Sequence, residues 1–208
     1  VEHQSVKEMR KNGHTNLIDG LAETPGVSQI STGTSIGKPV IRGLSASRVL
    51  VYAQGIRLEN QQFGEEHGLG LSASGIESVE IIKGPAARVF GQNAFTGAVN
   101  IVTKKEITTG GTAQIGAGSY SQLQGGLSLS KRNENGGIFT HFSTISSDGY
   151  RYNTDFKNHT AYIKASVAEN KKLPVQVLAF FSGRKFGANG FYASPAAVNQ
   201  YEETQSSL

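Results

Sequence analysis

The sequence predicts an α+β domain, a short mixed sheet with small helices, over residues 1–107, followed by antiparallel β-strands over residues 108–208. Two observations support this prediction of the fold. Before residue 107, one helix-like stretch is followed by several short strand-like pieces with Gly-rich or polar connections. From residue 112, apolar and polar residues alternate strictly in segments of about ten residues.

In the first part, Thr15 can cap a short helix over residues 16–24, whose Leu17, Ile18 and Leu21 share one face. Pro25 and Gly26 then stop that helix. Further on, Pro85 suits the first turn of a short helix, and Gly91 can supply the positive φ that ends it. The predicted strands are "KPVIRGL" at 38–44, "RVLVYAQGIRL" at 48–58, "ESVEIIKG" at 77–84 and "AVNIVTK" at 98–104.

In the second part, each segment has one apolar and one polar face. In "QLQGGLSLS", Leu123, Leu127 and Leu129 oppose glutamines and serines, and "TAYIKASV" repeats the pattern with Ile163 and Val167. Short turns at 133–137 and 169–172 alternate with a longer link at 147–158, an arrangement typical of outer-membrane barrels. A soluble β-sandwich gives the same period. About five strands cannot close a barrel, which indicates a piece of something longer.

Composition and motifs exclude several classes of function. Without cysteine there is no disulfide framework and no thiolate ligand. The net charge of +4 is spread without a basic run longer than two residues, which argues against a nucleic-acid partner. No apolar run approaches a membrane-spanning helix, and the first ten residues do not form a signal peptide. No catalytic or phosphate-binding motif is present, so we expect neither an enzyme nor a cofactor.

Linked motifs across residues 15–105 carry a family resemblance. "PGV", "VIRGL", "RVLVYAQGIRL" and "GIESVEIIKGPAARVFGQNAFTGAVNIVTKK" resemble, in order and spacing, the plug domain of TonB-dependent outer-membrane receptors. The resemblance implies a plug inside a 22-stranded barrel, with about the first five barrel strands and a polar C-terminal loop present here. Gln54 stands where the family commonly has aspartate, and no TonB box is visible before Val1.

The resemblance also implies a function. Such a receptor lies in the outer membrane of a Gram-negative bacterium, binds a scarce nutrient and gates its import when TonB acts on the plug. Its implied partners are TonB, a small-molecule or metal-chelate ligand and membrane lipid; the ligand classes are ferric siderophores, haem, cobalamin and metals. The alternative is a soluble β-rich module that binds carbohydrate or protein. The isolated chain has an open strand edge, so its strands are expected to pair with another copy, to collapse onto the plug or to be disordered.

Two segments, residues 28–38 and 58–74, correspond in this resemblance to apical loops that floor the ligand site. Glu65, Glu66 and His67 together suit a transition metal or a metal chelate, although a solvated polar loop explains them as well. Candidate ligand-binding residues are Ser31, Thr32, Thr34, Ser35, Asn60, Gln61, Gln62, Phe63, Glu65, Glu66 and His67.

A second group of candidates are charged residues among apolar or small neighbours, which would contact the polar lumen of a barrel and take part in gating. Ordinary surface charge explains them equally. Small residues at 86, 87, 94, 97 and 98 are expected to let the plug backbone approach the barrel wall closely. The candidate gating contacts are Arg42, Arg57, Glu77, Glu80 and Arg88.

Overall fold

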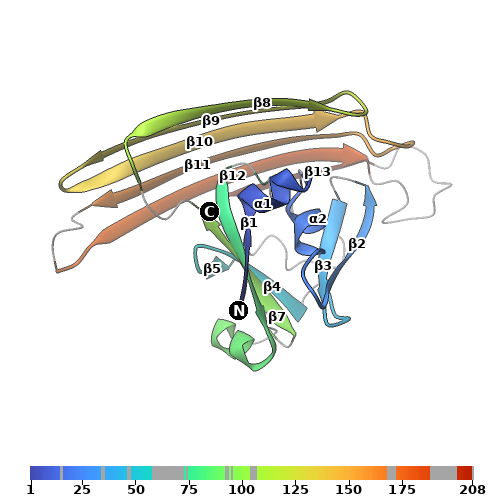
Figure 1. The fold of residues 1–208 in the computed structure, drawn as a ribbon, viewed down its shortest axis with the longest axis horizontal. Helices are drawn as coiled ribbons and strands as arrows, with labels where there is room; N and C mark the ends of the chain where they lie inside the picture. The colour runs from blue at the N-terminus through green and yellow to red at the C-terminus, as the bar shows by residue number, and fades with distance from the viewer. Residues whose placement is uncertain are drawn as a thin grey trace.

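The computed structural model describes residues 1–14, 16–33, 36–45, 48–57, 73, 75–91, 94, 96–103, 107–167, 172–187 and 201–207. In this part of the chain, a five-stranded sheet with its helices and a two-stranded hairpin form an N-terminal domain. A six-stranded sheet arches over that domain, with α1 beneath it (Figure 1). The predicted α+β domain followed by antiparallel strands is confirmed.

The five-stranded sheet is mixed, in the order β1-β6-β7-β4-β5. Its β4 and β7 are parallel, and the other pairs are antiparallel. Every residue of β4 is buried, because this strand lies inside the sheet with apolar clusters on both of its faces. The strands are β1 (Glu2–Ser5), β4 (Val49–Ala53), β5 (Ile56–Arg57), β6 (Ile76–Lys83) and β7 (Gly97–Thr103).

Two short helices cover one face of this sheet. The first, α1 (Val6–Lys11), buries Val6 and Met9 and was not predicted. The second, α2 (Leu17–Leu21), buries Leu17, Ile18 and Leu21 as predicted. Its N-cap is Asn16, whose side-chain oxygen accepts a hydrogen bond from the Ile18 amide at 3.0 Å; Thr15, the predicted cap, lies outside the described residues.

A hairpin replaces the loop predicted at 28–38. Residues of β2 (Val27–Gly33) pair antiparallel with β3 (Ile36–Ile41). The loop was implied by the family resemblance, and the segment "SQISTG" is polar and lacks a clear alternation that would have predicted a strand. Backbone pairing with the predicted neighbouring strand is what makes it a strand here.

The turn after β6 forms as predicted, but as a 3-10 helix, η3 (Gly84–Phe90), with Pro85 in its first turn. Gly91 ends it at φ +93°, where a Cβ would be strained. Ala87 and Ala98 are fully buried in a cluster with Leu50 and other residues of the domain itself. In the described structure these small residues therefore serve the domain's own core, in place of the predicted approach to the wall.

The six-stranded sheet is entirely antiparallel, in the order β13-β12-β11-β10-β9-β8. Five of its strands match the predicted alternating segments. The sixth lies in the tail predicted as a polar loop, because the edge of β12 offers backbone hydrogen-bonding groups with which even a polar segment can pair. The strands are β8 (Gly110–Gly118), β9 (Gln122–Asn133), β10 (Gly136–Ser147), β11 (Phe156–Val167), β12 (Val175–Gly187) and β13 (Tyr201–Ser207).

The two faces of this sheet differ as the alternation predicts. Apolar side chains on the outward face are exposed, among them Ile115, Leu127 and Phe142. Polar side chains on the face toward the N-terminal domain are buried, among them His141 and Thr160. Among the described residues, no helix is long and apolar enough to cross a membrane.

Candidate functional site: the interface between the domain and the sheet

Arg10 of α1 connects the N-terminal domain to the six-stranded sheet. Its Nη1 donates to Oε1 of Gln114 on β8 at 2.6 Å, and its Nη2 donates to the Ala73 carbonyl at 2.8 Å. The guanidinium retains contact with solvent, while desolvation by the surrounding protein lowers its pKa from the usual value. It stays protonated at neutral pH, so both hydrogen bonds have a charged donor.

A second connection is made around Gly75. The Tyr162 hydroxyl of β11 donates to the Gly75 carbonyl. Gly75 has φ +77°, and a Cβ built there would lie 2.5 Å from Cδ2 of His141 on β10. Only glycine therefore lets this backbone approach the sheet so closely.

The inward face of the sheet carries polar atoms without partners. His141 shares a hydrogen bond with Ser128 through Nδ1 at 2.8 Å, but its buried Nε2 has no partner within the described structure. The hydroxyls of Ser143 and Thr160, opposite each other in the β10–β11 register, are likewise buried and unpartnered there. Buried polar groups of this kind are normally satisfied, if not by protein then by ordered water.

A small apolar cluster completes the interface. Ile107, which precedes β8, packs with Phe139 and Tyr162, whose rings stack at 5.5 Å between centroids. Phe180 of β12 packs against both this cluster and the core of the N-terminal domain. The contact between the N-terminal domain and the six-stranded sheet is therefore partly apolar and partly polar, unlike the apolar core of the domain.

A cavity of about 210 Å³ lies next to Arg10, between the domain and the sheet. Its lining includes His14 and Ala73 on the domain side, and Gln114 and Gln124 on the sheet side. A space of this size with polar side chains in its lining accommodates several waters. It is smaller than the roughly 300–1,000 Å³ of ligand pockets, so passage of a large solute requires the interface to rearrange.

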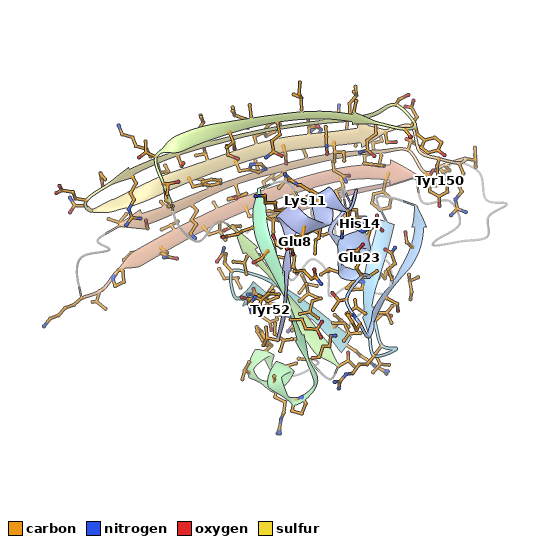
Figure 2. All side chains as sticks on the ribbon, viewed as in Figure 1. Glu8, Lys11, His14, Glu23, Tyr52 and Tyr150 are labelled. Carbon is orange, nitrogen blue, oxygen red and sulfur yellow. The ribbon has the colours of Figure 1, made fainter. Side chains whose placement is uncertain are left out.

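On the domain side of this cavity, hydrogen bonds connect the residues that follow α1 to the residues that follow α2. Nε2 of His14 lies 2.7 Å from Oε1 of Glu23, and Asn12 donates to Oε2 at 3.0 Å (Figure 2). These hydrogen bonds from His14 and Asn12 lower the pKa of the Glu23 carboxyl below its usual value. His14 also lines the cavity, so its hydrogen bond with Glu23 fixes one edge of the cavity.

Most predicted ligand-binding residues lie outside the described residues: Thr34, Ser35 and the whole set from Asn60 to His67, including the proposed metal ligands. Ser31 and Thr32 lie on β2, where the Ser31 hydroxyl donates to the Gly33 carbonyl at 2.7 Å. Among the described residues, no group of three or more His, Asp and Glu side chains is placed to hold a metal ion.

The predicted gating residues are spread over the N-terminal domain. Glu77 interacts electrostatically with Tyr162 of the sheet. Glu80 accepts a hydrogen bond from Asn100 at 2.9 Å, within the domain. Arg42 lies beside Gly84, Arg57 is half-buried on β5, and Arg88 is exposed on η3.

Sequence reasoning missed Arg10, Gly75, His141 and Tyr162, which make the interface described above. A signal existed for two of them. His141 and Tyr162 stand on the polar faces of alternating strands, and these faces were expected to turn away from lipid. Nothing in the local sequence marks Arg10, because its partner Gln114 is 104 residues away.

Comparison with known proteins gives the family. The model of the TonB-dependent Receptor Plug Domain matches residues 1–98. The chain is 31% identical over 137 residues to the vitamin B12 transporter BtuB of Vibrio vulnificus (strain CMCP6), covering 64% of this chain and 22% of that protein. It is 28% identical over 109 residues to the iron-regulated outer membrane virulence protein of Vibrio cholerae serotype O1 (El Tor Inaba N16961), covering 49% of this chain and 17% of that protein.

A solved structure confirms the fold. The copper transporter OprC superposes with a TM-score of 0.75 at 20% identity, covering 89% of this chain and 31% of that one. The chain thus spans about a fifth of the length of these two curated relatives and a third of the structural neighbour. From the plug match, the outer-membrane relatives and the shared fold, we conclude that this chain belongs to the TonB-dependent receptors of the Gram-negative outer membrane.

Proposed function

We propose that this chain belongs to a receptor that binds a scarce extracellular nutrient and admits it to the periplasm. The N-terminal plug domain is its gate, and the six-stranded sheet is part of the barrel wall. The observation that carries the proposal is the interface between the plug domain and the six-stranded sheet. It combines few direct hydrogen bonds, buried polar atoms without partners and a cavity with room for water. Such a wet, partly polar contact separates at lower cost than a packed core.

The energy for opening has to come from outside the barrel, and we infer that TonB supplies it by acting on the plug. Ligand binding then has to favour one of two plug arrangements, because a ligand shifts an equilibrium only by its difference in affinity for the two states. No bond is made or broken in this scheme. The relatives fit it by name, since one is a vitamin B12 transporter and another a copper transporter.

Uptake measurements test this proposal. Cells expressing the complete open reading frame would be supplied with radiolabelled cobalamin, haem and ferric siderophores, with and without a functional TonB system. We expect accumulation of one of these that stops when TonB is removed, while binding at the cell surface persists. Accumulation that is indifferent to TonB would contradict the proposal.

For the ligand, we infer an iron chelate or a metal, because Glu65, Glu66 and His67 are suited to transition-metal chemistry. In this inference the loop at 58–74 faces outward, together with Ser31 and Thr32. The double variant Glu66→Ala/His67→Ala should weaken ligand affinity. Glu59→Ala, which removes a carboxylate of the same segment that is not among the candidate residues, is the control. An unaltered affinity in the first variant would remove the inference.

We also propose that the gate ends at residue 107 and the wall begins at residue 108. In support, β7 ends at Thr103, β8 begins at Gly110, and Ile107 packs on Phe139 of the sheet. The five charged residues Arg42, Arg57, Glu77, Glu80 and Arg88 remain our candidates for gating contacts. Hydrogen exchange during TonB-driven transport should change on the N-terminal side of this boundary and stay constant on the other.

A further inference from the structure

The outward face of the six-stranded sheet changes character along the strands. In its middle rows the residues are apolar, as at Leu127, Phe142 and Phe181, which lie in one register row. Towards the end that carries the connection 148–155, the corresponding row contains Ser146, Lys157 and Lys185. A band of apolar residues thus gives way to a basic edge at one end of the sheet.

Lys157 and Lys185 are direct register partners on β11 and β12. Both side chains are exposed, and neither forms a hydrogen bond or ion pair in the part of the chain that the structure describes. Like charges directly opposite each other are destabilising. An anion at this place would relieve the repulsion between the two ammonium groups.

An open groove of about 700 Å³ begins at Lys157. Lys157 and His159 line one side of it, while Ile115 and Leu123 line the other. Gly125 also lines it, and the lack of a side chain there leaves room between the two sides. Ile115 is 95% exposed, although it is large and apolar. The groove therefore has a cationic end and an apolar side. This combination fits an amphiphilic molecule with an anionic head group.

The end of the sheet nearest the groove carries exposed tyrosines. The rings of Tyr120 and Tyr150 meet edge-on, with their centroids 6.3 Å apart, and both side chains are exposed, as is Tyr152. Tyr150 lies at the end of the six-stranded sheet (Figure 2). Tyrosines of this kind mark the head-group level of membrane proteins. The connection 148–155 at this end is longer than the turn 134–135 at the other, which is typical of the extracellular side.

We propose that this groove is a binding site for a phosphorylated lipid of the outer leaflet. The phosphate lies against the ammonium groups of Lys157 and Lys185, and an acyl chain runs over Gly125 between Ile115 and Leu123. The two ammonium groups attract the phosphate. The apolar side of the groove favours a lipid over a free anion. This site is independent of the nutrient that the receptor imports.

The test uses the purified product of the complete open reading frame in neutral detergent. Binding is measured for a lipid A bearing two phosphates, for the same lipid without phosphate, and for inorganic phosphate. We expect tight binding of the first only. Lys157→Gln/Lys185→Gln should weaken it at least tenfold, at about fivefold for each lysine. Lys131→Gln, an exposed lysine of the same sheet at its opposite end, is the matched control and should leave binding unchanged.

A second variant tests the apolar part without altering charge. Gly125→Leu places a side chain in the groove, and a Cβ there meets nothing closer than Thr144 at 4.0 Å, so the sheet tolerates it. It should lower lipid affinity severalfold. The proposal is overturned if both variants bind the phosphorylated lipid as the parent does, if Lys131→Gln loses as much, or if inorganic phosphate binds as tightly as the lipid.

Discussion

In the five-stranded sheet of the plug, both faces are covered by residues of the same domain, whereas the six-stranded sheet of the wall leaves its apolar face bare. Alternate residues of β4 show the first case: Val49 and Val51 enter the cluster beneath the helices, and Leu50 and Tyr52 enter the cluster at η3. Among the described residues, the wall has one small buried cluster of its own, formed by Ile145, Phe156 and Phe186, and a second at its contact with the plug. The difference teaches that the plug carries its own core, while the wall takes its apolar environment from lipid.

Truncating the plug core should have the largest effect. Ile81 is fully buried, and Ile81→Ala should cost about 2–5 kcal/mol of plug stability through lost burial and a residual cavity. Native-state hydrogen exchange of the β6 and β7 amides in the complete receptor measures it. The matched variant Ile115→Ala, at a residue that is 95% exposed on the outward face of the wall, should change the stability of the plug by about 0.5 kcal/mol or less. Equal effects would erase the distinction between the two sheets.

A charge on the outward face of the wall should have the next largest effect. Phe142 lies in the middle of the apolar rows, and Phe142→Arg should destabilise the folded wall in a bilayer by about 2–4 kcal/mol. Phe142→Leu, which keeps an apolar side chain, is the control. Unfolding by urea in lipid vesicles gives both values. If arginine were tolerated like leucine, this face would not contact lipid.

Substitution at the contact between the two parts should be smaller. Gly75→Ala combines a left-handed φ with a Cβ at 2.5 Å from the His141 ring, and should cost about 1–3 kcal/mol of plug–wall docking. Gly13→Ala is the control, because Gly13 has φ +87° with nothing within 4 Å of a Cβ. Protease sensitivity of the plug measures docking. A Gly75→Ala loss no larger than that of Gly13→Ala would mean that the close approach contributes nothing.

The smallest effect concerns acid pH. Because the folded-state pKa of Glu23 is lowered by His14 and Asn12, its contribution to stability is complete above its ordinary pKa of 4.5 and is lost as the pH falls through the lower folded value. The protection factors of the α1 amides, which are exchange rates corrected for the intrinsic effect of pH, should therefore fall below about pH 4.5. Glu23→Gln should remove that dependence. Glu8→Gln, at a residue of α1 outside these hydrogen bonds, should keep it.

What the sequence predicts well are elements that their own residues define. The wall strands β8 to β12 were predicted because apolar and polar residues alternate over most of β8, β9 and β11 and, less regularly, in β10 and β12. The hairpin strand β2 and the edge strands β1 and β13 were missed, since "EHQS", "SQISTG" and "YEETQSS" are polar and become strands only by pairing with a neighbour. Propensity contains no information about such partners.

The same reason limits the prediction of the site. The family resemblance pointed to the plug and to the membrane, and both are borne out. The contact between Arg10 and Gln114 joins residues far apart in the chain, and Gly75 has its role because of a histidine on another strand. Such pairings follow from how the two sheets dock, which no local pattern encodes.

The most direct test of the account is to lock the plug to the wall. Since the chain has no cysteine, Arg10→Cys/Gln114→Cys can be joined by a reducible bifunctional thiol reagent across the place where these side chains now bond. The pair Gly118→Cys/Gln122→Cys, register partners on β8 and β9, is the control that links the wall only to itself. We predict that the first crosslink abolishes import, keeps ligand binding and is reversed by reductant, while the control crosslink leaves import intact. Normal import with the plug locked would contradict the account.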